Sequence, residues 1–138
     1  VLGGRWRNPA SEQLLDHPAL QGRVWRIADV PEDELAALYS GALALAFPSL
    51  YEGFGLPALE AIACGTPVLA QNSSSLPEAV GAAGCLLPND QAAWVAALER
   101  MCHDSAWQQH LAAQTSAQAA KFSWQQVAQR LEATLDTL

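Results

Sequence analysis

Short apolar runs, separated by turn residues and amphipathic segments, dominate the first 87 residues of the chain. The runs at 42–47, 67–71 and 84–87 hold few polar side chains, which is typical of strands covered on both faces of a sheet. Residues 23–27 form a further strand candidate, and the first four residues resemble the end of another. We therefore expect about four short strands, the first of them an edge left by truncation.

Two helices are marked by their end residues. Pro31 opens the first, whose acidic first turn suits the positive helix end and whose apolar face extends to Tyr39. Pro57 suits the first turn of the second, and Gly65 suits a left-handed cap at its end. Because Pro67 cannot continue a helix, the second helix is expected to be short.

Further helix starts are predicted by three S-x-x-E/Q capping boxes, which are Ser75 with Glu78, Ser105 with Gln108, and Ser123 with Gln126. From residue 90 onward the pattern is wholly helical, with two apolar stripes that we expect to face the core and not a partner groove. The alternative for the last helix is that it reaches across to another domain. The stripes are Trp94, Val95, Leu98, Met101 and Cys102, and then Trp124, Val127, Leu131, Leu135 and Leu138.

Alternation of strands and helices with short connections predicts an α/β fold. We expect a Rossmann-like, three-layer α/β/α arrangement with a short parallel sheet and right-handed crossovers. Residues 1–138 are predicted to form a single, N-terminally truncated domain, with residues 90–138 as its helical C-terminal portion.

Composition and charge argue against some classes of binding partner. The chain has 14 acidic and 7 basic residues, so it lacks the basic patch that displaces counterions from a nucleic acid. Cys64, Cys85 and Cys102 have no metal-ligand spacing, and we expect them to be small core residues in a reducing compartment, the cytoplasm, with no metal bound. No apolar run approaches the roughly 20 residues that a bilayer span requires.

The candidate site is the glycine-bearing loop and helix start at 48–60. Ligands of an open parallel sheet bind beyond the carboxyl ends of its strands, which here are followed by residues 29–30, 48–56 and 72–75. Glu52 begins the middle loop, and Glu60 lies in the first turns of the following helix. Either acid alone is most simply a solvated surface residue, but the pair at this spacing is more specific. Ionised carboxylates accept hydrogen bonds from vicinal hydroxyl groups, so the pair suits a hydroxyl-rich ligand.

Backbone amides complete this candidate site. The first N–H groups of a helix lack intrahelical partners and favour anions, and glycine lets a ligand approach the backbone closely. The amides available for sugar hydroxyls or a phosphate are those of Gly53, Phe54, Gly55 and Leu56.

The segment from Glu52 to Glu60, EGFGLPALE, followed by AIACGTPV, resembles the E-x7-E region of group 1 (family 4) retaining glycosyltransferases. The stretch from Val30 to Tyr39 is similar to the V-P-x-x-E-L-x-x-L-Y segment of that family, and residues 75–78 and 84–88 resemble later segments. The similarity covers about residues 22–138. It implies the C-terminal, donor-binding domain of the GT-B fold, in which two Rossmann-like domains enclose the active site.

Roles for single residues follow from the resemblance. Glu52 would be catalytic, contacting the donor sugar or stabilising the charge that develops as the bond to phosphate breaks. Glu60 would hold the ribose hydroxyls, and the backbone of Val30 would meet the nucleobase. The amides of Gly53, Phe54, Gly55 and Leu56 would line the sugar and phosphate pocket. The donor would be a nucleotide-diphosphate sugar, with no cofactor.

The chain also departs from the family. Members have an Arg and a Lys early in this domain, whereas nothing precedes Val1 here and Arg5 and Arg7 come too late to match. The usual Gly-Gly is Ser74-Ser75. We expect a fragment that binds nucleotide weakly and does not turn over alone. The full-length enzyme is expected to take a saccharide or lipid-linked acceptor through an N-terminal domain and to associate peripherally with membranes.

Two other functions use the same residues. A glycoside hydrolase also needs two carboxylates, although it does not need a glycine-rich loop between a strand and a helix. A non-catalytic nucleotide-sugar-binding or interaction module would retain the fold without the transfer.

Overall fold

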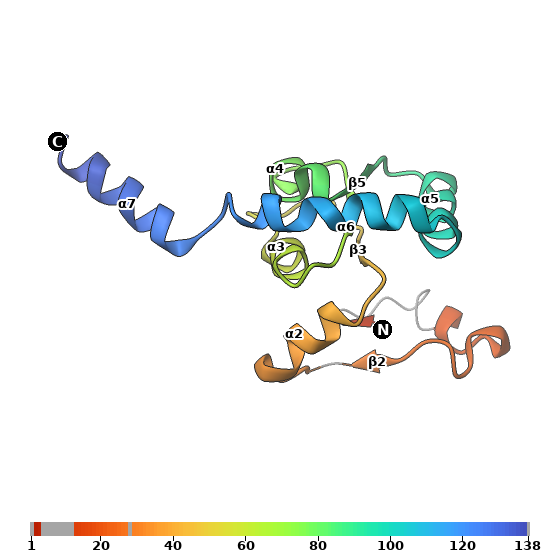
Figure 1. The fold of residues 1–138 in the computed structure, drawn as a ribbon. Helices are drawn as coiled ribbons and strands as arrows, with labels where there is room; N and C mark the ends of the chain where they lie inside the picture. Colours follow the sequence, from red (N-terminus) through yellow and green to blue (C-terminus); the bar gives the residue numbers. More distant parts are fainter. Residues whose placement is uncertain (1, 4–12, 28, 138) are drawn as a thin grey trace. The chain divides into compact units, whose positions relative to one another are not determined.

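The computed structural model describes residues 2–3, 13–27 and 29–137 of the chain (Figure 1). The chain divides into two compact units, Val1–Leu35 and Ala36–Leu138, and the single domain expected from the sequence stays a prediction. In the first unit, strands β1 (Leu2–Gly3) and β2 (Arg26–Ile27) pair in parallel. A 3-10 turn, η1 (Pro18–Leu20), lies between them in sequence.

The second unit contains a three-stranded sheet of β3 (Leu45–Phe47), β4 (Val68–Gln71) and β5 (Gly84–Leu87). Its order is β3-β4-β5 and both pairings are parallel, which confirms the predicted short parallel sheet. All four residues of β4 are buried, as expected for the central strand. The expectation that β3 is covered on both faces is wrong, because Ala46 is exposed and its neighbours are half-buried. Among the described strands, β3 pairs only with β4.

Helices account for most of the remaining described residues. They are α2 (Glu32–Ser40), α3 (Leu56–Ala63), α4 (Leu76–Val80), α5 (Gln91–His103), α6 (Ser105–Ala119) and α7 (Trp124–Leu135), with a 3-10 turn η2 (Gly81–Ala83) after α4. None of these helices is long and apolar enough to cross a membrane.

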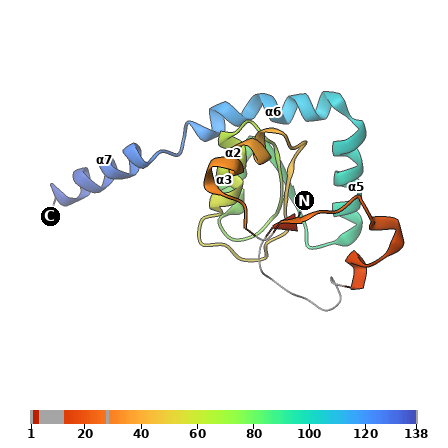
Figure 2. The same cartoon turned by 90° about the horizontal axis from the view of Figure 1, so that it is seen from below.

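Alternation along β4 divides the core of the second unit into two clusters. Val68 and Ala70 pack with α3 and α4, whereas Leu69 packs with residues of β5, α5 and α6. Helix α6 also contacts α3 (Figure 2). It contacts η2 as well, so it lies against both layers of helices. These layers on the two faces of the sheet give the three-layer α/β/α arrangement that the sequence predicts.

The buried face of α5 differs from the predicted stripe. Ala97 and Met101 are buried, and Trp94 packs against the same cluster, at i, i+3 and i+7 spacing. Val95 and Leu98 are exposed, and so is Cys102. The stripe was placed partly on the wrong face because an alanine, not the larger residues beside it, points to the sheet. Cys64 and Cys85 are only half-buried, so the expectation of three core cysteines is also wrong.

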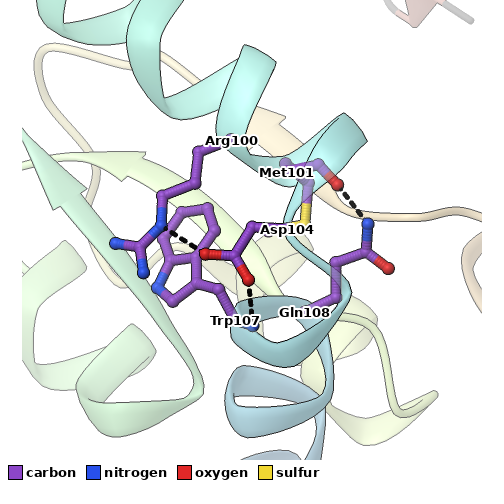
Figure 3. Close-up of polar contacts among 5 residues, drawn as sticks. All are labelled: Arg100, Met101, Asp104, Trp107 and Gln108. Carbon is purple, nitrogen blue, oxygen red and sulfur yellow. Dashed lines mark hydrogen bonds and ion pairs between the residues drawn. The ribbon is translucent and has the colours of Figure 1, made fainter.

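The corner between α5 and α6 is built on Asp104 (Figure 3). Its Oδ1 accepts a hydrogen bond from the Trp107 amide at 2.9 Å, and its Oδ2 accepts one from Arg100 Nε at 3.0 Å. These two bonds, the amide bond first, hold the pKa of Asp104 below its usual value. The guanidinium of Arg100 also lies 4.4 Å from the centre of the Trp107 ring. Asp104, and not Ser105, is therefore the N-cap of α6, which corrects the predicted capping box.

Helix α7 begins as predicted, because the hydroxyl of Ser123 accepts from the amide of Gln126 at 3.1 Å. Its apolar stripe is not buried, however. Trp124 is 81% exposed and Leu131 and Leu135 are each 59% exposed, which contradicts the expectation that this stripe faces the core. Leu138 lies outside the described residues.

One buried amide side chain links α6 to α4. Gln118 is 3% exposed, and its Nε2 donates to the carbonyls of Glu78 and Ala79 at 2.9 and 3.0 Å. Its Oε1 accepts from Lys121 Nζ at 2.8 Å. Because the last carbonyls of a helix have no intrahelical partner, Gln118 satisfies groups that would otherwise be buried at the end of α4.

Candidate functional site

Two loops lie side by side at the carboxyl edge of the three-stranded sheet. The loop at 48–55 follows β3, and the loop at 72–75 follows β4. Three serine hydroxyls of the second loop donate to carbonyls of the first: Ser73 to Ser49 at 3.3 Å, Ser74 to Glu52 at 2.6 Å, and Ser75 to Glu52 at 3.2 Å. The structure therefore brings together two of the three segments that the sequence places at this edge.

Gly55 makes the turn from the first loop into α3. It is buried, has φ +81° and ψ +43°, and serves as the N-cap of the helix without a side chain. A Cβ atom at this position would lie 2.8 Å from Cδ2 of Leu76, so both the backbone angle and the packing require glycine. The helix begins at Leu56, one residue before the predicted Pro57.

Gly53 has the opposite surroundings. It is exposed, its φ is not positive, and no atom lies within 4 Å of the place where a Cβ would stand. The space beside Gly53 is thus open to a ligand, and the two glycines of the motif have different functions.

Four consecutive amides of this loop and helix start have no partner among the described residues. In the part of the chain that the structure describes, no hydrogen bond is formed by the N–H groups of Gly53, Phe54, Gly55 or Leu56. The first recorded donor of the helix is the amide of Ala58, which bonds the carbonyl of Gly55 at 3.0 Å. Unpaired amides at the start of a helix can receive oxygen atoms of an anion or a hydroxyl group.

The two carboxylates of the motif differ in their contacts. Glu52 is half-buried in the loop, and within the described residues its carboxylate has no hydrogen bond or ion pair. Glu60 is exposed on α3, and its Oε2 accepts a hydrogen bond from the hydroxyl of Tyr39 at 3.3 Å. Glu52 is therefore available to a ligand, whereas Glu60 is held on one side by a tyrosine.

Tyr39 is itself anchored at the end of α2. Its carbonyl accepts a hydrogen bond of 2.6 Å from Oγ1 of Thr66, which is 2% exposed. Its ring packs against the core cluster around α3. Sequence reasoning treated Tyr39 only as part of an apolar face, because a contact between residues 21 positions apart leaves no local signal.

Tyr39 gives the site a measurable pH dependence. Burial in the first place, and then the nearby carboxylate of Glu60, raise the pKa of Tyr39 from 10.0 to about 12. Because the folded state holds this proton more tightly than the unfolded chain does, the stabilisation is complete below about pH 10 and is lost as the pH rises toward about 12. We expect the urea midpoint of the wild-type chain to fall across this interval, and that of Tyr39→Phe to fall less. Parallel decreases in the two proteins would contradict the assignment.

An aromatic pair joins the same loop to the segment between α6 and α7. The ring of Phe54 lies 5.7 Å from the ring of Phe122, centre to centre, at an interplanar angle of 76°. This edge-to-face contact is a favourable aromatic geometry. The side chain of Phe54 is still 40% exposed beside this contact, and its amide has no partner among the described residues. Phe122 was not predicted as part of the site.

The remaining expected residues lie elsewhere in the chain. Val30 is half-buried and belongs to the first unit, Val1–Leu35, so its predicted contact with a nucleobase stays a prediction. Arg5 and Arg7 lie outside the described residues. Among the residues described, no group of three or more His, Cys, Asp or Glu side chains could hold a metal ion.

Sequence comparison gives matches over most of the chain. Residues 2–122 match the family described as "Glycosyl transferases group 1". The chain is 40% identical over 121 residues to the O-antigen chain mannosyltransferase B of Escherichia coli, covering 87% of this chain and 32% of that protein. It is 44% identical over 108 residues to the D-inositol 3-phosphate glycosyltransferase of Streptosporangium roseum, covering 76% of this chain and 25% of that protein. The chain spans about a third or less of the length of these relatives.

Solved structures show the same fold. Sucrose-phosphate synthase from Thermosynechococcus elongatus superposes with a TM-score of 0.82 at 33% identity, over 92% of this chain and 33% of that chain. HepE from Anabaena, solved in complex with UDP-glucose, superposes with a TM-score of 0.81 at 23% identity, over 94% of this chain and 36% of that chain.

Proposed function

Because this chain belongs to the group 1 glycosyltransferases and has the α/β/α architecture of a GT-B domain, we propose that it forms the donor-binding part of a sugar transferase. The donor is a nucleotide-diphosphate sugar. One observation carries this assignment: four unpartnered amides and an unpartnered carboxylate, Glu52, lie together at the carboxyl edge of the sheet. Amides receive phosphate or hydroxyl oxygens, and the carboxylate receives hydroxyl hydrogens or faces developing positive charge.

Glu52 is assigned to the sugar and to the transition state. When the bond between the sugar and the diphosphate lengthens, positive charge grows on the sugar ring, and a fixed carboxylate stabilises that charge more than it stabilises the ground state. Its lack of a protein partner in the described residues supports this role, because a paired carboxylate would have to break that pairing first.

Glu60 is assigned to the ribose of the nucleotide. A carboxylate has room for several hydrogen bonds, so the single bond from Tyr39 leaves acceptor sites for two vicinal hydroxyl groups. The backbone of Val30 is assigned to the nucleobase. No cofactor besides the donor takes part in this scheme.

The proposal also covers the sugar, the stereochemistry of transfer, the acceptor and the location of the enzyme. A relative named as a mannosyltransferase supports transfer of a hexose. We also propose retention of configuration, a saccharide or lipid-linked acceptor bound through a further domain, peripheral membrane association of the complete enzyme, and a cytoplasmic location.

Calorimetric titration with UDP-, GDP- and ADP-sugars tests donor binding. We expect measurable, weak binding of one nucleotide class to the wild-type chain. Gly53→Ala is the matched variant, because the added methyl group meets no protein atom within 4 Å but enters the space assigned to the donor. It should fold like the wild type and lose most of the affinity. A folded wild-type chain that binds none of these donors would remove donor recognition from this chain.

A further inference from the structure

Two serine hydroxyls converge on a single carbonyl at the site. Ser74 Oγ lies 2.6 Å and Ser75 Oγ 3.2 Å from the carbonyl oxygen of Glu52. A carbonyl oxygen has two lone pairs, so these two donors fill its acceptor capacity. Ser73 adds a third contact between the loops, from its hydroxyl to the carbonyl of Ser49 at 3.3 Å.

Ser74 adopts a costly backbone conformation to make this bond. Its φ is +53°, and it is the one non-glycine residue with positive φ in the described part of the chain. The left-handed region costs an L-residue roughly 1–2 kcal/mol, and glycine would avoid that cost. The chain nevertheless has a residue here whose hydroxyl makes the shortest of the three contacts between the loops. A strained residue held in place by its surroundings is a sign of a functional constraint.

The direction of the Glu52 carbonyl determines the direction of the next amide. A trans peptide is planar, and its C=O and N–H point to opposite sides. When Ser74 and Ser75 hold the oxygen, the N–H of Gly53 must point away from them. That amide has no partner among the described residues, and the space around Gly53 is open.

We propose that Ser74 and Ser75 are positioning residues that fix the peptide between Glu52 and Gly53, so that the Gly53 amide is presented to the donor and the Glu52 side chain starts from a fixed backbone. This role rests on the proposed function. Without the two hydroxyls the peptide can rotate, and the amide must be ordered again each time a donor binds. Preorganised donors avoid that cost.

The test compares the transferase activity of the double variant Ser74→Gly/Ser75→Ala with that of the wild type. It uses a preparation in which the wild type has measurable sugar transfer. Glycine removes the strain together with the hydroxyl, so the variant should unfold no more readily than Ser74→Ala/Ser75→Ala. We expect its kcat/KM for the donor to fall about tenfold, mainly through KM, which is the size of effect expected for one weakened hydrogen bond to a charged donor group. Ser75→Thr, which keeps a hydroxyl, should retain more activity than Ser75→Ala. The exposed Ser116→Ala serves as the control substitution.

Two results would overturn the positioning role. One is a double variant with the kcat/KM of the wild type, and the other is equal activity of Ser75→Thr and Ser75→Ala. A ligand-free measurement separates this role from the proposed function: the Gly53 amide resonance should move, and its hydrogen exchange should quicken, in Ser74→Gly/Ser75→Ala. If the wild-type enzyme transfers no sugar but that resonance moves, the proposed function fails and the peptide is still held by the serines. An unchanged resonance would refute the serine role itself.

Discussion

Replacing Glu52 by alanine is expected to lower the rate of sugar transfer by about a hundredfold or more. The comparison uses a preparation of the protein in which the wild type has measurable transferase activity. Removing one group that stabilises charge in a transition state typically costs a factor of about 10² to 10³ in kcat. Nucleotide affinity should change only a few-fold, because Glu52 is assigned to the sugar and not to the nucleotide. Steady-state kinetics with the donor varied, together with calorimetry on the nucleotide diphosphate, measures both quantities.

Two further substitutions make this prediction specific. Glu60→Ala should show the reverse pattern, with weaker nucleotide binding and a smaller loss in kcat, since Glu60 is assigned to the ribose. Glu99→Ala, an exposed acid on α5, should leave both unchanged. Equal losses of transfer and nucleotide binding in Glu52→Ala would contradict the assignment of Glu52 to the transition state.

Gly84→Ala is expected to cause the largest loss of stability. Gly84 pairs with Val68 between β4 and β5, and a Cβ atom there would lie 2.0 Å from the carbonyl oxygen of Val68 and 2.6 Å from Cγ1 of Val80. The carbonyl oxygen of Val68 belongs to the backbone of the central strand, so it cannot move away by a change of side-chain rotamer. The two strands must separate, which we expect to cost about 3 kcal/mol or more of the free energy of unfolding.

The backbone angle is not the cause of this loss, because φ of Gly84 is −163°, an extended value that any residue adopts. Gly65→Ala is the matched control. Its φ is +84° and no atom lies within 4 Å of the added methyl, so it should lose only the roughly 1–2 kcal/mol of a left-handed alanine. Urea unfolding followed by circular dichroism compares the two. A Gly84→Ala midpoint equal to or above that of Gly65→Ala would show that the strands yield more easily than the structure implies.

The proline and glycine residues at its two ends, Pro57 and Gly65, predicted α3 well. The amide of Gly65 bonds the carbonyl of Ile62 at 3.0 Å and that of Thr66 bonds Ala61 at 2.9 Å, which is the Schellman pattern that ends a helix at a left-handed glycine. The strands at 68–71 and 84–87 were also predicted from their apolar runs. These features depend on residues a few positions apart, so a single sequence contains them.

The loop at 72–75 was not predicted correctly from neighbouring residues in the sequence. Ser75 with Glu78 has the letters of a capping box, but Ser75 makes no side-chain cap. Its φ and ψ of −83° and −9° are helical, not the extended values of an N-cap, and its hydroxyl donates to Glu52 instead. The competing acceptor lies 23 residues away, so the sequence pattern alone could not distinguish the two bonds.

The prediction that the apolar stripes of α5 and α7 are buried was wrong for a different reason. Periodicity finds an apolar face but does not show whether anything covers it. The stripe of α7 has the expected spacing and is exposed, whereas the buried face of α5 includes Ala97, a residue that a search for large apolar side chains passes over. The contacts that Tyr39 and Phe122 make with the site were missed because each joins residues far apart in the sequence.

An NMR titration of the ¹⁵N-labelled chain tests most directly whether the open side of the 48–55 loop receives a nucleotide sugar. With UDP-, GDP- and ADP-sugars added in turn, one series should shift the amides of Gly53, Phe54, Gly55 and Leu56 most. Shifts confined to α5, where a hollow is lined by Asp90, Val95 and Glu99 among others, would place the ligand elsewhere and contradict the account, as would the absence of any shift.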